Sequence, residues 1–584
     1  MIVHIQGQGS SVSLTQRDYV GGGGEGAVYK VGKIAYKIYH DPAKMIPVAK
    51  FKELSVITDP HVIRPQSMLV DAKGLVVGYT MPFLDGGYPL CQLFPRSFRD
   101  REGVTTGHIT NLVAKMQAGI QHVHQTGTLI VDLNEMNFLV DKKFDDLFFI
   151  DVDSYQTPHF PATVIMDSIR DWSVHHNQWS TNSDWYSFGI LSFQMYTGIH
   201  PFRGKYHGPK AEFRGRLPSD PDDDAFATTR RRMLGGISVM HPEVGIPGSA
   251  YPLSVIPKEY RQWYEDMFVN GQRCPPPSKA GAMGVILFVP QVNALSGTLV
   301  DFMELWNLQY AITSFLGSSI LGGNPVITAG NKVYLGGALV PVPWDKPTTV
   351  CGHTNRTHRV VVGSLEGTKL SLFNLTDRVP LTFDMEVQNA VSYEGRIYVR
   401  TEDQIHEVAL TDAGSQVLAT LKVVCNVMPH ATHLFSGVAI QSMLGATFVS
   451  LFTGPGEAQQ VRVKELDTFR VVDAKYDRGV LMVLTEKAGK YDRQVFRFEA
   501  DGTYDIRVVA DVSSGQSLNF VTLDNGVCVC MNEDEKLELF SARKGSSSIK
   551  TVEDKTLSGA LTLARHEGSL VAYQGTKVLK LKMK

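Results

Sequence analysis

Polar side chains at a spacing suited to phosphoryl transfer stand out in one short stretch of the chain. The stretch HQTGTLIVDLNEMNFLV contains Asp132, Asn134 and Asn137, and the apolar run LFFI that follows ends at Asp151. A carboxylate such as Asp132 can orient an attacking hydroxyl group and take its proton. An amide oxygen and a second carboxylate, from Asn137 and Asp151, can hold Mg2+ against phosphate oxygens. Both groups of residues follow apolar, strand-like segments that would fix their positions.

A glycine-rich stretch near the N-terminus could approach a phosphate group. The sequence GGGGEGAVY places Gly21, Gly23 and Gly26 ahead of Val28. Glycine lets backbone N–H groups reach a phosphate without a clash from Cβ. Such a stretch is unspecific by itself, because glycine-rich turns between strands are common. Lys37 follows in the strand-like IAYK and could pair with nucleotide phosphates or simply lie exposed on a strand.

Taken in order, these motifs resemble those of the protein kinase fold. Further along, SDWYSFG, TGIHPF and FVNGQR resemble segments of the kinase C-terminal lobe. The resemblance covers residues 1 to about 280 and is nearest to bacterial and phage kinase-like proteins with G-D-L-N-x-x-N and I-D-x-D-S-[FY]-Q motifs. It implies a bilobal α+β domain over residues 1–273, with an N-terminal lobe of about 1–84 and a C-terminal lobe of about 85–273.

The resemblance implies a role for each matching polar residue. Asp132 and Lys37 would be catalytic, and Asn134 would stand where kinases carry a lysine beside the transferred phosphate. Asn137 and Asp151 would bind the metal. The cofactors implied are ATP and Mg2+.

Other residues would bind the nucleotide. The backbone of the loop from Gly21 to Val28 would hold the phosphates, and Met81 and Phe83 would contact the adenine ring. Glu53, in the helix-like AKFKELSVI, is the carboxylate expected to pair with Lys37.

Departures from the kinase motifs leave alternatives open. Ile130 and Val131 stand in place of the His and Arg of H-R-D, and residues 157–180 contain no recognisable A-P-E. Asp153 stands where a glycine is usual and could be a further carboxylate of the site or a turn residue. A serine/threonine protein kinase is the favoured function. A pseudokinase scaffold, a phage or assembly component, and a small-molecule phosphotransferase are the alternatives.

The composition excludes several other classes of protein. Lysine plus arginine number 57 against 59 acidic residues, a net charge of −2. We therefore expect no nucleic-acid partner and no membrane surface partner. No apolar run approaches the ~20 residues that span a bilayer, and the six scattered cysteines fit a reducing compartment. We predict a cytoplasmic protein, in the host cytoplasm or a virion if it is phage-encoded.

The second half of the chain repeats a glycine turn followed by an alternating apolar strand. The spacing of about 42 residues is typical of four-stranded β-propeller blades. We predict a propeller of about seven blades over 291–584, with a β-sandwich pair or a β-helix as alternatives, and a Pro- and Gly-containing linker over 274–290 that lets the halves be separated. The propeller would recruit a protein substrate or partner. The turn glycines are Gly330, Gly395, Gly437, Gly479, Gly526 and Gly568.

Overall fold

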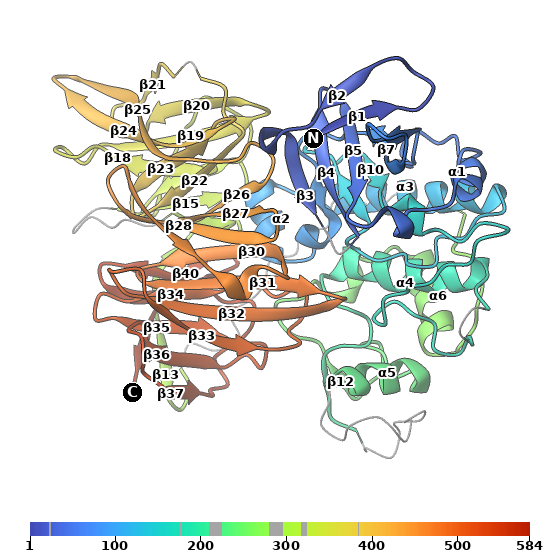
Figure 1. The fold of residues 1–584 in the computed structure, drawn as a ribbon. Helices are drawn as coiled ribbons and strands as arrows, with labels where there is room; N and C mark the ends of the chain where they lie inside the picture. The colour runs from blue at the N-terminus through green and yellow to red at the C-terminus, as the bar shows by residue number, and fades with distance from the viewer. Residues whose placement is uncertain (23–24, 176–177, 209–224, 279–295, 317–323, 384) are drawn as a thin grey trace.

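The structure is a computed structural model of residues 1–584 and describes all of them except 23–24, 176–177, 209–224, 279–295, 317–323 and 384. Two unlike regions lie side by side (Figure 1): sheet and helices up to residue 278, and strands with little else from residue 296 onward. Gly23 and most of the predicted linker lie outside the described residues. Among the helices that are described, none is long and apolar enough to cross a bilayer.

The N-terminal region begins with a seven-stranded sheet in the order β2-β1-β6-β7-β5-β4-β3. Its strands are rich in β-branched and aromatic residues, which favour extended backbone. One face buries a small apolar core that includes Val3, Tyr36, Ile38 and Leu69. The strands are β1 (Ile2–Ile5), β2 (Ser11–Ser13), β3 (Tyr19–Gly22), β4 (Gly26–Val31), β5 (Ile34–Tyr39), β6 (Ser67–Val70) and β7 (Val76–Pro82).

Helices dominate the rest of this region. The long helix α3 begins after Thr105, whose side chain accepts a hydrogen bond from the backbone N–H of His108. The helix is amphipathic, and its face with Leu112, Met116 and Ile120 is buried. The helices are α1 (Val48–Leu54), α2 (Arg96–Glu102), α3 (Thr106–Gln125), α4 (Thr181–Thr197), α5 (Ala225–Gly235) and α6 (Lys258–Phe268). Short strands are β8 (Tyr88–Pro89), β9 (Phe138–Val140), β10 (Leu147–Phe149), β11 (Lys205–Tyr206) and β12 (Val244–Gly245).

Seven four-stranded antiparallel sheets make up the described part of the C-terminal region. Six consist of consecutive strands: β14–β17, β18–β21, β22–β25, β26–β29, β30–β33 and β34–β37. The seventh joins the two ends of the region, because β13 pairs antiparallel with β40, placing Val300 opposite Met583. The strands are β13 (Val300–Asn307), β14 (Ser314–Phe315), β15 (Val326–Ala329), β16 (Lys332–Leu335), β17 (Ala338–Val340), β18 (Val350–His353), β19 (Val360–Glu366), β20 (Lys369–Asn374), β21 (Val379–Leu381), β22 (Asn389–Tyr393), β23 (Arg396–Arg400), β24 (Gln404–Ala413), β25 (Gln416–Asn426), β26 (Thr432–Phe435), β27 (Val438–Met443), β28 (Ala446–Gly454), β29 (Glu457–Arg462), β30 (Arg470–Asp477), β31 (Val480–Lys487), β32 (Lys490–Phe498), β33 (Tyr504–Val509), β34 (Phe520–Thr522), β35 (Val527–Met531), β36 (Leu537–Ser541), β37 (Ile549–Val552), β38 (Thr562–His566), β39 (Ser569–Gln574) and β40 (Lys577–Met583).

Apolar clusters join each sheet to the next and the last sheet to the first. The sheets therefore form a closed, propeller-like ring, which we call the ring, and the predicted all-β, propeller-like character is confirmed. Cluster members from adjacent sheets are Ile327 with Val578, Val333 with Val362, Val350 with Ile397, Tyr398 with Phe452, Val449 with Leu481, Met482 with Cys528, and Val529 with Leu579.

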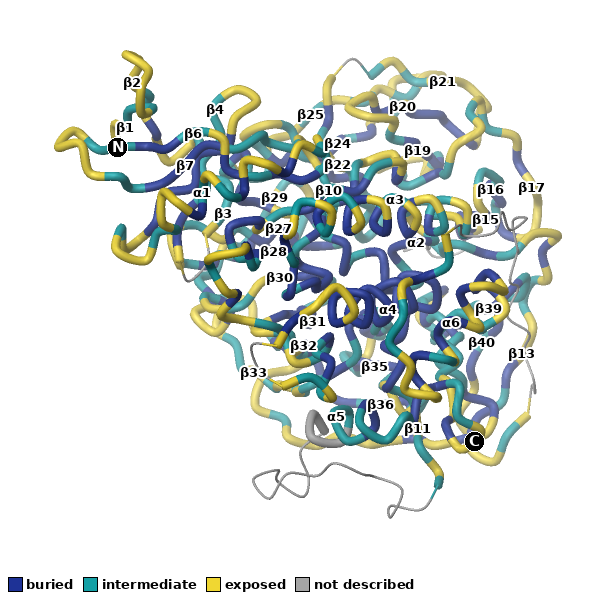
Figure 2. Tube along the Cα trace, turned by 90° about the vertical axis from the view of Figure 1, so that its right-hand side faces the viewer, coloured by how far each residue is buried: buried dark blue, intermediate teal, exposed yellow. Residues whose placement is uncertain are grey.

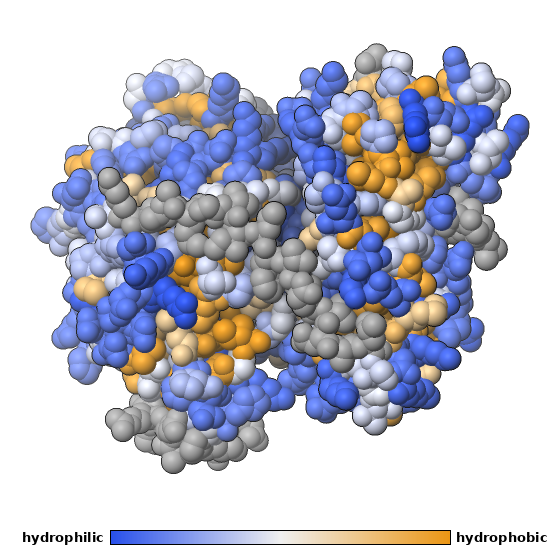
Figure 3. Space-filling model, turned by 180° about the vertical axis from the view of Figure 1, so that it is seen from behind, coloured by the Kyte–Doolittle hydropathy of each residue, from blue (hydrophilic) through white to orange (hydrophobic). Residues whose placement is uncertain are grey.

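The two regions share one apolar cluster. Phe188 and Phe193 of α4 belong to the same cluster as Met482 of β31, and Figure 2 shows buried chain running through α4 and on to β30 and β31. A polar contact reinforces the joint, because Gln194 Nε2 donates to Ser514 Oγ at 2.6 Å. Seen from behind, the outer surface is mostly hydrophilic with apolar patches on both regions (Figure 3). This shared packing argues against halves that separate freely.

Candidate active site

Lys37 lies at the centre of the site. It stands on β5 opposite Val28 of β4, and it is 9% exposed, so it is not the exposed strand lysine that the sequence left open. Its Nζ donates to Asp153 Oδ2 at 2.6 Å and lies 3.4 Å from Asp151 Oδ1. The hydroxyl of Tyr39 donates to the same oxygen of Asp153 at 2.6 Å. One lysine therefore gathers both carboxylates that follow β10.

The two carboxylates differ in their electrostatics. Burial alone would raise the pKa of Asp153, but the charge and hydrogen bond of Lys37 and the hydroxyls of Tyr39 and Tyr79 together outweigh burial and lower it. Burial and the neighbouring Asp153 raise the pKa of Asp151 to about 6, against the weaker pull of Lys37. The pKa of Lys37 is raised in turn, because Asp153 and Asp151 outweigh the effect of burial. With a side chain that is 46% exposed, Asp151 is the carboxylate available to a further cation.

The loop 130–137 begins in a strained conformation. Val131 has φ 63°, in the left-handed region that β-branched residues avoid. The fully buried Asp184 of α4 compensates, because its carboxylate accepts from Ile130 N at 2.8 Å and from Val131 N at 2.9 Å. His124 Nε2 lies 2.9 Å from the same carboxylate. The motif SDWYSFG thus contributes the anchor of this loop.

Asp132 is oriented by uncharged donors. Its Oδ1 accepts from the backbone N–H of Met166 at 2.8 Å, and burial raises its pKa. Asn137 donates to the backbone oxygen of Asp132 at 2.9 Å and lies 3.5 Å from Oδ2. Asn134 is 2% exposed, and its side-chain oxygen accepts from Met136 N at 2.8 Å. The side chain of Asn134 therefore stabilises the loop itself through its hydrogen bond with Met136 N.

The described glycines of the glycine-rich stretch lie at the facing ends of β3 and β4. Gly21 pairs with Val28 and Gly22 with Ala27 in the antiparallel register. A Cβ atom on Gly26 would lie 2.4 Å from the backbone oxygen of Ile38, so this position requires glycine. The close pairing of β4 with β5 places Val28 opposite Lys37.

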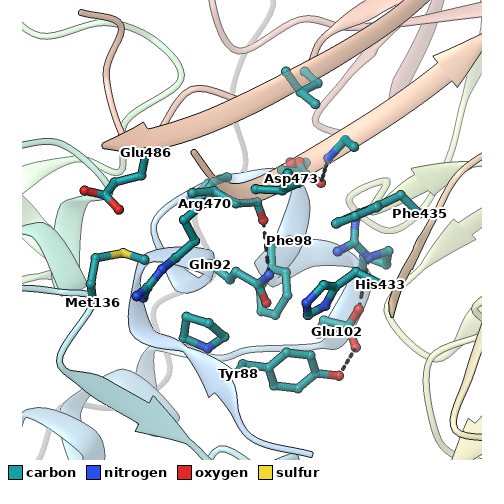
Figure 4. A pocket seen from close by; sticks show the side chains of 18 of the residues that line it. Tyr88, Gln92, Phe98, Glu102, Met136, His433, Phe435, Arg470, Asp473 and Glu486 are labelled. Carbon is teal, nitrogen blue, oxygen red and sulfur yellow. Dashed lines mark hydrogen bonds and ion pairs between the residues drawn. The ribbon is translucent and has the colours of Figure 1, made fainter. Parts of the chain in front are cut away.

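A cavity of about 3080 Å3 lies between the two regions. Most of the predicted nucleotide and metal residues line it, but Asp132 is not among its lining residues. Figure 4 shows another part of its wall, where Gln92 Nε2 donates to Val472 O at 3.1 Å and Arg470, Asp473 and Glu486 come from the ring. The predicted residues that line it are Gly21, Gly26, Val28, Lys37, Met81, Phe83, Asn137 and Asp151.

Glu53 lies elsewhere than the sequence suggested. Its carboxylate is 2.7 Å from His159 Nδ1 and accepts from His159 N at 3.3 Å. The buried partner of Lys37 is Asp153 instead. A 3-10 turn, Val152–Ser154, follows Asp151 and brings Asp153 back toward β5. The sequence offered only a carboxylate two residues beyond Asp151 as a signal for this pairing.

The arginine of FVNGQR forms an ion pair whose acidic partner the sequence did not identify. Arg273, of the motif FVNGQR, makes a bidentate contact with Asp171, with Nε donating to Oδ2 at 2.5 Å and Nη2 to Oδ1 at 2.9 Å. Asp171 lies in the stretch 157–180, where no landmark could be recognised. The side chain of Asp171 is almost fully buried, so this pair fixes the end of that stretch to α6 and its C-terminal extension.

Part of the chain is similar to protein kinases, although no family model matches it. It is 33% identical over 100 residues to human ribosomal protein S6 kinase alpha-6, covering 16% of this chain and 13% of that protein. It is 27% identical over 130 residues to Xenopus laevis ribosomal protein S6 kinase 2 alpha, covering 21% and 17%. It is 28% identical over 131 residues to mouse ribosomal protein S6 kinase alpha-3, again covering 21% and 17%. The chain thus spans only 13–17% of the length of these relatives, and the similarity indicates a kinase-like segment.

Proposed function

We propose that the N-terminal region is an ATP- and Mg2+-dependent protein kinase of the serine/threonine type, with lobes of about 1–84 and 85–273. One observation carries the proposal: Lys37, Asn137 and Asp151 line a single cavity, and the loop that holds Asn137 also holds Asp132 in a fixed orientation. The kinase-like segment supports it. The bacterial and phage kinase-like proteins are the relatives that we propose, and the cytoplasm or a virion is the proposed location.

The nucleotide would bind against the β3–β4 turn. Backbone N–H groups of the turn and the ammonium group of Lys37 would hold its phosphates, with Met81 and Phe83 beside the base. Asn137 and Asp151 fit Mg2+, which prefers hard oxygen ligands and needs only one or two from the protein. Within the described residues no three His, Cys, Asp or Glu side chains group as a metal site. When bound, Mg2+ neutralises phosphate charge.

Asp132 would act on the phosphoryl acceptor. The N–H of Met166 holds Oδ1, so Oδ2 is the oxygen that would orient a serine or threonine hydroxyl and accept its proton. The hydroxyl oxygen bonds to the γ-phosphorus as the bond from phosphorus to the ADP oxygen breaks. The ring would recruit the protein substrate or a partner.

The test is phosphoryl transfer by the full chain with labelled ATP and Mg2+. Asp132→Asn should lose turnover by about 100-fold or more and keep the rise in melting temperature caused by Mg-ATP. Glu259→Gln, exposed on α6, is the matched control and should behave like the wild type. Equal labelling by the wild type and Asp132→Asn would mean that a contaminant transferred the phosphate.

A pseudokinase scaffold is the second candidate. It is favoured by Val131 in place of the usual arginine and by the position of Asp132, which is not among the lining residues of the cavity. A thermal shift with Mg-ATP but no labelling by the wild type would select the scaffold.

A further inference from the structure

A hairpin of the ring reaches the loop that carries Asp132. Strands β31 and β32 turn at residues 487–490, where Ala488 and Gly489 have φ of 52° and 77°. Just beyond the turn, the hydroxyl of Tyr491 donates to Glu135 Oε1 at 2.6 Å. Glu135 lies between Asn134 and Met136 in the loop 130–137, so one ring residue holds this loop directly.

The Tyr491–Glu135 contact is enclosed on all sides. Tyr491 is 5% exposed and Glu135 is 3% exposed. Burial raises the pKa of Glu135, and the nearby carboxylates Glu486 and Asp132 raise it further, whereas the Tyr491 hydroxyl opposes that rise. A buried carboxylate left without its donor is costly. Loss of the hydroxyl should therefore move Glu135, and with it the backbone on which Asp132 stands.

The same hairpin supports the other side of Asp132. A Cβ atom on Gly489 would lie 2.3 Å from Cγ of Met166, so the turn packs directly against this residue. Met166 N donates to Asp132 Oδ1 at 2.8 Å. The turn is itself held, because Gly489 N donates to Glu486 Oε1 at 2.8 Å. The end of this hairpin, through Gly489 and Tyr491, thus touches both segments that set the orientation of the Asp132 carboxylate.

We propose that Tyr491 is a positioning residue for phosphoryl transfer, which through Glu135 holds the Asp132 loop in its working geometry. The inference rests on the proposed kinase function and deepens it. It makes the ring a part of the catalytic unit, in addition to any role in recruitment. Positioning is worth much in catalysis, because small displacements of a catalytic group reduce turnover steeply.

The first test is kinetic and uses the full chain. Tyr491→Phe should lower kcat by roughly 10- to 100-fold and leave the KM for ATP and the Mg-ATP thermal shift unchanged. Ser514→Ala is the matched control, because it removes a buried contact between the regions of the same length that does not touch the loop. Glu135→Gln keeps an oxygen acceptor and should retain most activity, whereas Glu135→Ala should match Tyr491→Phe. The double variant Tyr491→Phe with Glu135→Ala should lose no more than either alone.

The second test does not depend on activity. Hydrogen exchange of residues 130–138 should speed up in Tyr491→Phe and stay unchanged in Ser514→Ala. If the wild type transfers no phosphate, the proposed function fails, and the exchange rates still decide whether Tyr491 holds the loop. The inference is overturned if Tyr491→Phe exchanges like the wild type, if it keeps the wild-type kcat, or if Ser514→Ala reduces kcat equally.

Discussion

Two pairs of carboxylates at the site are held in opposite ways. Asp151 and Asp153 lie beside the cation Lys37, and Asp151 also lines the large cavity. Asp132 and Glu135 are held by uncharged donors; Glu135 is buried and Asp132 is partly buried. In the first pair, two carboxylates share one ammonium group. The excess negative charge suits a metal ion, and the ammonium group suits phosphates. The second pair has fixed geometry that suits proton transfer.

The two pairs also differ in where their support comes from. Lys37 belongs to the same N-terminal region as the carboxylates that it holds. The donor to Glu135 comes from Tyr491, 356 residues away along the chain. Nucleotide chemistry should therefore depend mainly on the N-terminal region, and acceptor chemistry on both regions.

The largest effect is expected when the chain is divided into residues 1–285 and 286–584, which separates the two regions. The proline-rich stretch near 274 suggests separable halves, but the shared apolar cluster predicts the reverse. Met136 and Tyr491, which are buried against each other where the two regions meet, would become exposed, one on each half. We expect each half alone to aggregate or to lose cooperative unfolding, measured by circular dichroism melts.

A control keeps the chain continuous while loosening the connection. A flexible Gly-Ser insertion after residue 283 should leave the melting temperature close to that of the wild type. If residues 286–584 alone are soluble and unfold cooperatively, the cluster is dispensable for the ring.

Much of the candidate site could be predicted from short sequence motifs. Lys37, Asn137 and Asp151 could be predicted because each lies in a strand or within two residues of a strand end, and strands fix their positions relative to each other. The number of blades, about seven, could be predicted because each repeated glycine turn marks one local hairpin. Local geometry leaves a local signature in sequence.

The parts that were missed depend on contacts between distant segments. Asp153, not Glu53, pairs with Lys37, because the left-handed backbone of Asp151, with φ 59°, turns the chain back toward β5. The contact of Tyr491 with Glu135 has no sequence signal, because a tyrosine in an apolar strand usually belongs to the core. The pairing of β13 with β40 was likewise invisible, since spacing within repeats says nothing of how a ring closes.

Lys37→Met tests the charged pair. It would leave the carboxylate of Asp153, whose side chain is 4% exposed, without its cation. The expected loss in free energy of unfolding is about 3–5 kcal/mol, measured by urea denaturation. Adding Asp153→Leu should recover most of that loss, because an apolar pair can replace a buried ion pair.

A surface pair supplies the control. Lys30→Met breaks the ion pair with Asp85, whose side chain is 64% exposed, and should cost less than about 1 kcal/mol. Equal losses for Lys30→Met and Lys37→Met would show that burial does not distinguish the two lysines.

Asp151→Asn gives the smallest expected effect and tests the negative charge of the second carboxylate beside Lys37. The pKa of Asp151 is raised from 3.8 to about 6, so the folded protein favours its protonated form. The stability from this shift is present below about pH 4 and is lost as the pH rises through about 6. Asp151→Asn should therefore melt a few degrees above the wild type at pH 7.5 without nucleotide, with a difference that shrinks toward pH 4.5.

Mg-ATP at pH 7.5 should reverse the order of the two melting temperatures, because the variant lacks a metal ligand. Asp145→Asn, at an exposed position, should change neither result. An Asp151→Asn variant that gains as much from Mg-ATP as the wild type would contradict the assignment of Asp151 to the metal.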